Sequence, residues 1–248
     1  MSPKVMLTTS WDDGHPLDMR VAEILRRHGL HGTFYTPLRP VYGGLLSGAQ
    51  MGELMQMGME IGSHTVTHPI LTELDNAALD REMIDSRRGL EDMLGVDITS
   101  FCYPKGRFNR RVSQRAAAAG YRVRRTTVDF LTAPPTDAEN MTVSMHLFPH
   151  DRWAHYRHLL RYRNWEGFWN WHSRFDTATD LEKTTAHMLN SVAERGGVFH
   201  LWGHSWELES HNLWPVFERV AALMGRFAQS VQNAVSMTNR EVGDAARH

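Results

Sequence analysis

Two hydrophobic patterns alternate along the chain: short apolar runs and longer stretches in which apolar residues recur every three to four positions. The runs are typical of buried strands and the periodic stretches of helices. The runs predict strands at Val5–Thr9, Leu30–Thr36, Met59–Ser63, Ile98–Tyr103, Arg122–Val128, Met141–Phe148, Gly197–Trp202 and Ala234–Met237. The periodic stretches predict helices at Leu17–His28, Gln50–Gly58, Asp75–Leu94, Asn109–Ala119, Leu181–Arg195 and Leu213–Phe227.

This alternation predicts one α/β domain over residues 1–248. Strands separated by helices form a parallel sheet with right-handed crossovers. A single domain of this length is expected to be a closed or nearly closed (β/α) barrel. Two segments interrupt the alternation: a Pro-containing loop at 130–140 and a Trp-rich insertion at about 150–176. We expect Trp165, Trp169 and Trp171 to pack this insertion against the barrel, because large aromatic side chains dominate cores.

Metal-binding chemistry occurs in two stretches at the ends of predicted strands. Asp12 and Asp13 are adjacent carboxylates, which repel each other unless a cation or a proton lies between them. His64 and His68 are four positions apart, so one helical turn would place both rings on one face. One Asp and two His make a three-ligand set with an open position, and the other Asp is then free to act as a base.

Each stretch alone has a simpler interpretation. Asp-Asp-Gly is typical of a turn, and His-x-x-x-His is typical of a solvated helix face. Their occurrence in order, each beside a predicted strand, favours a metal site. The spacing leaves open which Asp is the ligand. Nitrogen and oxygen ligands without thiolate suit Zn²⁺, with Co²⁺, Ni²⁺ or Fe²⁺ as alternatives.

With three further stretches, the chain resembles the polysaccharide deacetylases of the NodB-homology type, carbohydrate esterase family four. The further stretches are Phe101-Cys-Tyr-Pro-Lys-Gly106, Gly120-Tyr-Arg-Val-Arg-Arg-Thr126 and Phe199-His-Leu-Trp-Gly-His-Ser-Trp-Glu207. The resemblance runs from about Val5 to about Glu209 and implies a distorted barrel of seven or eight strands. It also implies that Asp12 is the general base and Asp13 the metal ligand, together with His64 and His68.

The third stretch departs from the family pattern. The resemblance implies that the backbone N–H of Lys105, which follows Pro104, donates to the oxyanion of the tetrahedral intermediate. The family often has an arginine two residues before this proline, and this chain has Cys102 there. Arg125, at the end of its own predicted strand, is the candidate replacement; the alternative is a surface arginine.

Cleavage of an amide also requires a general acid, for which His200 and His204 are the candidates. At about 3.3 Å per residue, His200 lies roughly 13 Å further down the strand, towards the interior. His204 follows Gly203 near the mouth, so we expect His204 to be the acid and His200 to be a hydrogen-bonded core residue. Stacking on a sugar is expected of Trp11, Trp202 and Trp206, and Tyr103 and Pro104 are assigned to the same substrate site.

Composition limits the remaining classes. The net charge of −1 argues against electrostatic binding to nucleic acid or to anionic membranes. No apolar run approaches the length of about 18 residues that a transmembrane helix needs, and Met-Ser-Pro-Lys lacks the core of a signal peptide. The single cysteine excludes an internal disulfide and fits a reducing compartment. The sequence therefore predicts a cytoplasmic protein.

The predicted function is metal-dependent hydrolysis of the N-acetyl group of an amino sugar, which releases acetate. Polymeric and small substrates both remain open, and a cytoplasmic location favours a soluble or lipid-linked sugar. The nearest alternative is hydrolysis of another amide, such as a cyclic ureide or imide. A further alternative is an inactive carbohydrate-binding homologue, which the missing arginine favours.

Overall fold

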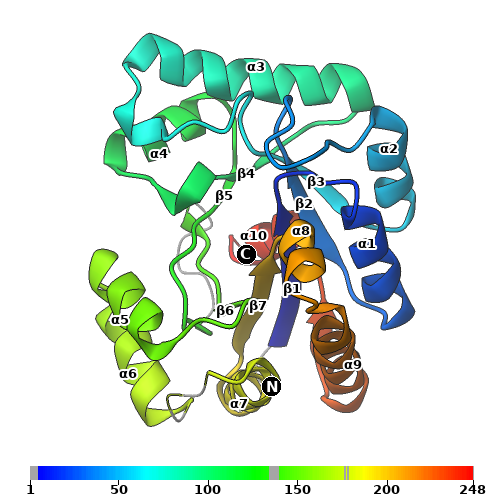
Figure 1. Cartoon of the computed structure of the whole chain (residues 1–248), viewed down its shortest axis with the longest axis vertical. Helices are drawn as coiled ribbons and strands as arrows, with labels where there is room; N and C mark the ends of the chain where they lie inside the picture. The colour runs from blue at the N-terminus through cyan, green and yellow to red at the C-terminus, as the bar shows by residue number, and fades with distance from the viewer. Residues whose placement is uncertain (1–4, 134–139, 176, 178, 248) are drawn as a thin grey trace.

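Eight parallel strands form the centre of the computed structural model, which describes residues 5–133, 140–175, 177 and 179–247. The strands are β1 (Val5–Asp12), β2 (Gly32–Thr36), β3 (Glu60–Ser63), β4 (Ser100–Cys102), β5 (Val123–Arg125), β6 (Met145–His146), β7 (Gly197–Gly203) and β8 (Ala234–Ser236). Their order is β5-β4-β3-β2-β1-β7-β6, and β8 pairs with the start of β1. The sheet is strongly curled (Figure 1).

The gap between the two ends of this sheet is spanned by the segment that leads into β6. Met141 forms an isolated parallel bridge with Arg125, and the amide of Ser144 donates to the carbonyl of His200 on β7 at 2.9 Å. The sheet is thus a distorted barrel, as expected from the alternating pattern. The predicted strand Met141–Phe148 is reduced to Met145–His146 because Met141 bonds to β5, whereas the segment pairs with β7 only from Ser144 onwards.

Helices surround the curled sheet (Figure 1). They are α1 (Asp18–Arg27), α2 (Gly48–Gln56), α3 (Asn76–Leu94), α4 (Arg110–Ala118), α5 (Arg152–Arg161), α6 (Trp165–Ser173), α7 (Leu181–Arg195), α8 (Ser205–Ser210), α9 (Trp214–Ser230) and α10 (Asn239–Ala245), with short 3₁₀ turns at Leu71–Glu73 and Pro104–Gly106. Local capping fixes several ends: Asp75 accepts from the amide of Ala78, and Gly95 ends α3 with φ 68°.

Helix α10, which the sequence pattern did not reveal, closes the amino end of the barrel. The side chain of Asn239 accepts from the Thr8 hydroxyl and donates to the Tyr35 hydroxyl, both at 2.9 Å. Val242 packs on residues near the starts of three strands, including Met6 and Val198. Among the described residues, α10 thus covers the end of the barrel opposite to the one at which the carboxyl ends of the strands lie.

The Trp-rich insertion forms the helical pair α5 and α6. Asp176, the last residue of the predicted insertion, is outside the described residues, as are residues 134–139 of the predicted loop. Trp171 is fully buried, as expected. The same expectation is wrong for Trp165 and Trp169, which are mostly exposed. The two lie one turn apart on the face of α6 that points away from the barrel, so helical periodicity placed them together but not inwards.

Candidate active site

The candidate residues meet at the carboxyl end of the barrel, each delivered by a different strand. Asp12 ends β1 and Asp13 follows it; His64 follows β3, Cys102 ends β4, Arg125 ends β5 and His204 follows β7. Parallel strands bring their carboxyl ends to one edge, so residues far apart in sequence converge there.

Three side chains form a candidate metal-ligand set. Asp13 Oδ1 lies 3.7 Å from His64 Nε2 and 3.5 Å from His68 Nε2, and all three residues are buried. Two ligands bound at about 2.1 Å to one tetrahedral ion are about 3.4 Å apart, so these atoms have the separation that a shared ion requires. Asp13 Oδ1 is buried without a hydrogen-bond partner among the described residues. The residues present therefore fit a divalent metal.

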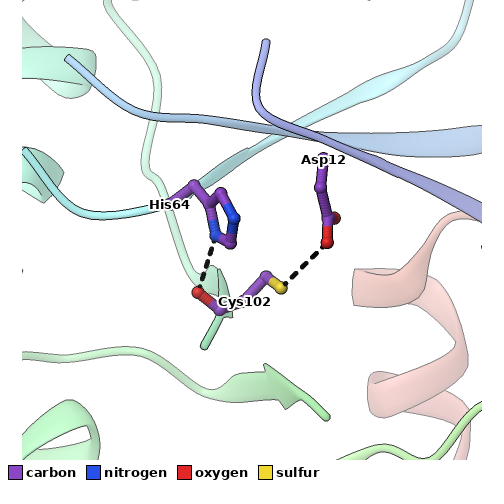
Figure 2. Close-up of side chains that lie close together, drawn as sticks. All are labelled: Asp12, His64 and Cys102. Atoms are coloured by element: carbon purple, nitrogen blue, oxygen red, sulfur yellow. Dashed lines mark hydrogen bonds between the residues drawn. The ribbon is translucent and has the colours of Figure 1, made fainter. Parts of the chain in front are cut away.

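Neighbouring groups orient these ligands. The Nδ1–H of His64 donates to the carbonyl of Cys102 at 2.9 Å (Figure 2), so the lone pair of His64 is on Nε2, which is on the side of Asp13. The indole of Trp206 donates to Asp13 Oδ2 at 2.9 Å. Such contacts fix ligand orientation. Burial lowers the pKa of His64, and burial together with the neighbouring His64 lowers the pKa of His68 to about 3. Both rings are therefore neutral, the form that binds a metal.

The prediction that a helical turn joins His64 and His68 is wrong. The segment is a loop in which Thr65 and His68 have φ of 70° and 57°. The carboxylate of Glu82 on α3 accepts from the amides of Val66 and Thr67, at 2.8 and 2.9 Å, and holds this loop. The two imidazoles are still adjacent, with ring centroids 4.7 Å apart, because the loop rather than a helix brings them together.

Asp12 is oriented by two side chains from neighbouring strands. Arg125 donates to Oδ1 in a buried ion pair, and the Cys102 thiol donates to Oδ2 at 3.5 Å (Figure 2). Burial alone would raise the pKa of Asp12, but the charge of Arg125, followed by His64, lowers it to about 2. Burial raises the pKa of the Cys102 thiol well above its usual value, so the thiol stays protonated. Asp12 is thus an ionised carboxylate held in one orientation.

Arg125 is fully buried, which excludes the surface-arginine alternative. Its guanidinium carbon lies 4.9 Å from the ring centroid of Trp202 and 5.4 Å from that of Tyr35. The flat guanidinium is therefore held between aromatic rings, which favour a cation over their faces, and it points at Asp12.

Glu207 on α8 joins two histidines at the other side of the site. It accepts from His204 Nδ1 at 2.7 Å and from His146 Nε2 at 3.0 Å. His204 Nε2 is 3.7 Å from Asp13 Oδ2, so the free nitrogen of this ring is close to the metal-ligand set. Burial lowers the pKa of His204, but the hydrogen bond and charge of Glu207 outweigh burial and raise it overall. His204 can therefore carry a proton into the site.

His200 is a core residue, as expected. Its Nε2 accepts from the Ser10 hydroxyl at 2.8 Å and its Nδ1 donates to the carbonyl of Thr142 at 3.1 Å. Burial, together with the charge of Arg125, lowers its pKa to about 3. Both ring nitrogens are engaged, so His200 has no free position to offer a substrate.

A cavity of about 270 Å³ opens beside Asp12 and His204. Of the predicted residues, Lys105 and Trp202 also line it. The far wall comes largely from the Trp-rich insertion and its surroundings: Thr127, Asp129, His146, His150, Ala154, His155, His158, Arg161 and Tyr162. The cavity is therefore bounded on one side by the catalytic candidates and on the other by α5.

The remaining predicted substrate residues lie elsewhere. Trp11 is fully buried and packs edge-on against Phe217, with ring centroids 4.8 Å apart. Tyr103 stacks on Phe108 at 5.0 Å. Neither of these aromatics lines the cavity, nor does Pro104. Trp206 lies against Asp13 instead.

Backbone strain marks three of the candidate residues. Asp13, His68 and Lys105 have φ of 77°, 57° and 55°, in the left-handed region that costs a residue with a side chain about 1 kcal/mol or more. Such strain concentrates at functional sites.

Sequence reasoning missed four residues that complete the site. Glu207 is the last residue of the stretch Phe199–Glu207 that carries the family resemblance. It lies three residues after His204, a spacing that indicates a contact across one helical turn. Glu82, His146 and Tyr42 carried no local signal. Tyr42 stacks on Trp206 with ring centroids 4.6 Å apart, and thereby covers the edge of the metal-ligand set.

Known proteins resemble this chain in both sequence and fold. Residues 2–124 match the family model described as Polysaccharide deacetylase. The "Putative polysaccharide deacetylase YxkH" of Bacillus subtilis (strain 168) is 31% identical over 128 residues, which are 51% of this chain and 46% of that protein. The chain thus matches about half the length of this curated relative.

Two solved structures illustrate the likeness. The Streptococcus pyogenes deacetylase PplD, in complex with acetate, is 26% identical with a TM-score of 0.50, over 54% of this chain and 61% of that one. A family 4 acetyl xylan esterase from Clostridium thermocellum, in complex with a cobalt ion, is 14% identical with a TM-score of 0.60, over 97% and 91% of the two chains, a likeness of fold. Arg125 and His204 lie beyond the family match at residue 124, so their assignment rests on geometry.

Proposed function

Because the chain belongs to the polysaccharide deacetylase family, we propose that it is a metal-dependent deacetylase that hydrolyses the N-acetyl group of an amino sugar. One observation carries this proposal. The orphaned Asp13 Oδ1 faces His64 and His68, and the same end of the barrel holds an ionised Asp12 and a His204 that can carry a proton. Base, ligand set and acid are thus the three parts that amide hydrolysis requires.

Asp13, His64 and His68 would hold the metal, and a bound divalent ion would supply Lewis-acid activation of water and of the amide carbonyl. Asp12 accepts the proton of the attacking water. The Nε2–H of His204 protonates the departing nitrogen, so that water and the amide yield acetate and a free amine. The N–H of Lys105 is the proposed donor to the developing oxyanion. Zn²⁺ is the proposed ion, since the ligands are two imidazoles and one carboxylate.

The cavity favours a small substrate over a long polymer. Its volume of about 270 Å³ lies just below the usual range for ligand pockets, which begins at about 300 Å³. Trp202 lines the cavity, but its ring is stacked on that of His146, with centroids 3.9 Å apart, and lies 4.9 Å from the guanidinium carbon of Arg125, so we propose that it borders the sugar site by its edge and does not stack on the sugar. In the described residues no helix is long and apolar enough to cross a membrane; the cytoplasmic location inferred from cysteine content stays a prediction.

Acetate release from a panel of N-acetylated amino sugars tests the proposed function. We expect turnover with the metal-loaded protein, loss of turnover after treatment with a chelator, and recovery when Zn²⁺ is restored. Hydrolysis of cyclic ureides or imides in place of these sugars would identify the alternative amidase. Sugar binding without turnover, in protein with full metal content, would identify an inactive homologue. The reason for considering that alternative was the missing arginine, and it no longer applies if Arg125 replaces that arginine.

The pairing of His204 with Glu207 makes a substrate-dependent prediction. An alkyl amine leaves poorly unless protonated, whereas an activated phenol leaves without help, so His204→Ala should lose about 10²–10⁴ in rate on an N-acetyl sugar and much less on an aryl acetate. Glu207→Gln should show the same split more weakly, because it removes the charge that keeps His204 protonated. Initial rates on both substrates measure the effect.

His200→Ala is the matched control. It should lower thermal stability, because Ser10 and Thr142 lose a buried partner, and should affect both substrates alike. A split that appears in His200→Ala and not in His204→Ala would mean that the acid lies deeper in the barrel.

A further inference from the structure

The helical pair α5–α6 exposes large apolar side chains that do not pack against the barrel. Trp153, Trp165 and Trp169 are 76%, 61% and 68% exposed, and Leu160 is 59% exposed. The other exposed large hydrophobic residues that the structure describes are scattered over different segments: Tyr42, Met93, Val96 and Val235. A concentration of this kind on an otherwise ordinary surface marks an interaction site.

These side chains form one continuous surface across the two helices. The ring of Tyr156 lies 6.1 Å from that of Trp153 on α5, and 6.1 Å from that of Phe168 on α6. Trp165 and Trp169 are one turn apart on α6, and Phe168, which is half-buried and packs partly against the core, lies at the border between this face and α5. The hairpin surface is defined by Trp153, Tyr156, Leu160, Trp165, Phe168 and Trp169.

Arginines are concentrated in the segment that carries this surface, and one of them, Arg161, also lines the cavity. Between residues 151 and 174 the chain has five arginines, all exposed, and two acidic residues: Arg152, Arg157, Arg161, Arg163 and Arg174 against Asp151 and Glu166. The carboxylate of Asp151 is already engaged, because it accepts from the amide of Ala154 at 2.7 Å and caps α5. The net charge of −1 for the whole chain therefore conceals a local excess of cations at the hairpin surface.

From this combination we propose that the hairpin surface docks onto a lipid bilayer that contains anionic lipid. Tryptophan and leucine enter the boundary between headgroups and acyl chains, and the arginines contact lipid phosphates while their aliphatic stems lie along the apolar layer. Each arginine near an anionic surface strengthens partitioning by roughly fivefold. The protein rests on the membrane and does not span it, in keeping with the absence of a spanning helix among the described residues.

Docking at this surface would place the substrate cavity beside the bilayer. Ala154, His155 and His158 on α5 line the cavity, whereas Trp153, Arg157 and Leu160 of the same helix are exposed. One helix therefore separates the cavity from the docking surface. This part of the inference rests on the proposed function: the substrate class that fits is an amino sugar linked to a membrane lipid, rather than a free polymer.

A polysaccharide is a poorer occupant of the same surface. Exposed tryptophans that guide a glycan to a catalytic centre would be expected along its cavity, yet Trp153, Trp165 and Trp169 are all absent from the cavity wall. The arginines also have no partner in an uncharged glycan, whereas lipid phosphates supply one for each.

Co-sedimentation of the full chain with unilamellar vesicles tests the proposal. We expect binding to vesicles of phosphatidylglycerol and phosphatidylcholine, much weaker binding to phosphatidylcholine alone, and loss of binding at high salt. Trp165→Ala/Trp169→Ala and Arg152→Gln/Arg157→Gln should each weaken binding by on the order of tenfold or more. Neither double variant should change the hydrolysis of a soluble substrate.

Arg81→Gln/Arg88→Gln on α3 is the matched control, since α3 lies at the opposite end of the molecule from α5 and α6 (Figure 1), and it should bind vesicles like the unmodified protein. Equal binding by all variants would overturn the proposal. The absence of binding to anionic vesicles would also overturn it. In that case, loss of self-association of the protein in the tryptophan variant would identify a second copy of the chain as the occupant of the surface, and loss of retention on insoluble glycan would identify a glycan. Because vesicle binding is measured without turnover, these outcomes are independent of whether the deacetylase assignment is correct.

Discussion

His68→Ala is expected to remove both the bound metal and measurable hydrolysis. Three protein ligands are the minimum for a tight site with an open position, and loss of an outer contact alone typically costs 10–100-fold in affinity. Loss of a direct ligand should therefore weaken metal binding by at least about 100-fold. Metal analysis after dialysis, together with acetate release, measures both effects, and Asp13→Ala and His64→Ala should behave in the same way.

The exposed His211 supplies the matched control, because it lies outside the ligand set. His211→Ala should keep full metal content and rate. If His68→Ala retained metal in full stoichiometry and turned over normally, the ligand set would be misassigned, and the neighbouring group formed by Asp12, His64 and Cys102 would be the next candidate.

Asp12→Asn should separate the base from the ligand, with the second-largest effect. The amide keeps the shape of the carboxylate but cannot accept the proton of water, so the rate should fall by roughly 10²–10⁴ while metal content is unchanged. Single-turnover acetate release and metal analysis on one preparation measure this. Loss of metal instead would mean that Asp12 and Asp13 exchange their proposed roles.

Arg125 provides the companion variants for this test. Arg125→Ala leaves a buried carboxylate without its cation, which typically costs 3–5 kcal/mol of stability, so kcat must be measured below the unfolding transition. There kcat should fall, and Arg125→Lys should recover little of it because a point charge cannot reproduce the guanidinium between two rings. A near-normal kcat in folded Arg125→Ala would leave Asp12 oriented by Cys102 alone.

Most of the secondary structure was predictable because it depends on local patterns. The predicted helix Leu181–Arg195 has the observed bounds of α7, and Asp75 and Asn109 are the N-caps of the helices predicted to start there. Failures occurred where partners are distant. Strand Met141–Phe148 shrank because it lies at a seam between two strands, and α10 was invisible because Asn239 is specified by Thr8 and Tyr35, more than 200 residues away.

The sequence by itself determined the barrel and brought the candidate ligands to one site, although the choice of Asp13 over Asp12 as the ligand came from the family resemblance and stays a prediction. Adjacent carboxylates after a buried strand, and two histidines after another, need only the rule that parallel strands end at one edge. The tertiary structure alone decided the rest. Arg125 faces Asp12 across 113 residues, Glu207 connects His204 with His146, and Trp165 and Trp169 face outwards. Local periodicity specifies which residues share a face, but which groups meet across that face depends on strand register and on the packing of distant elements.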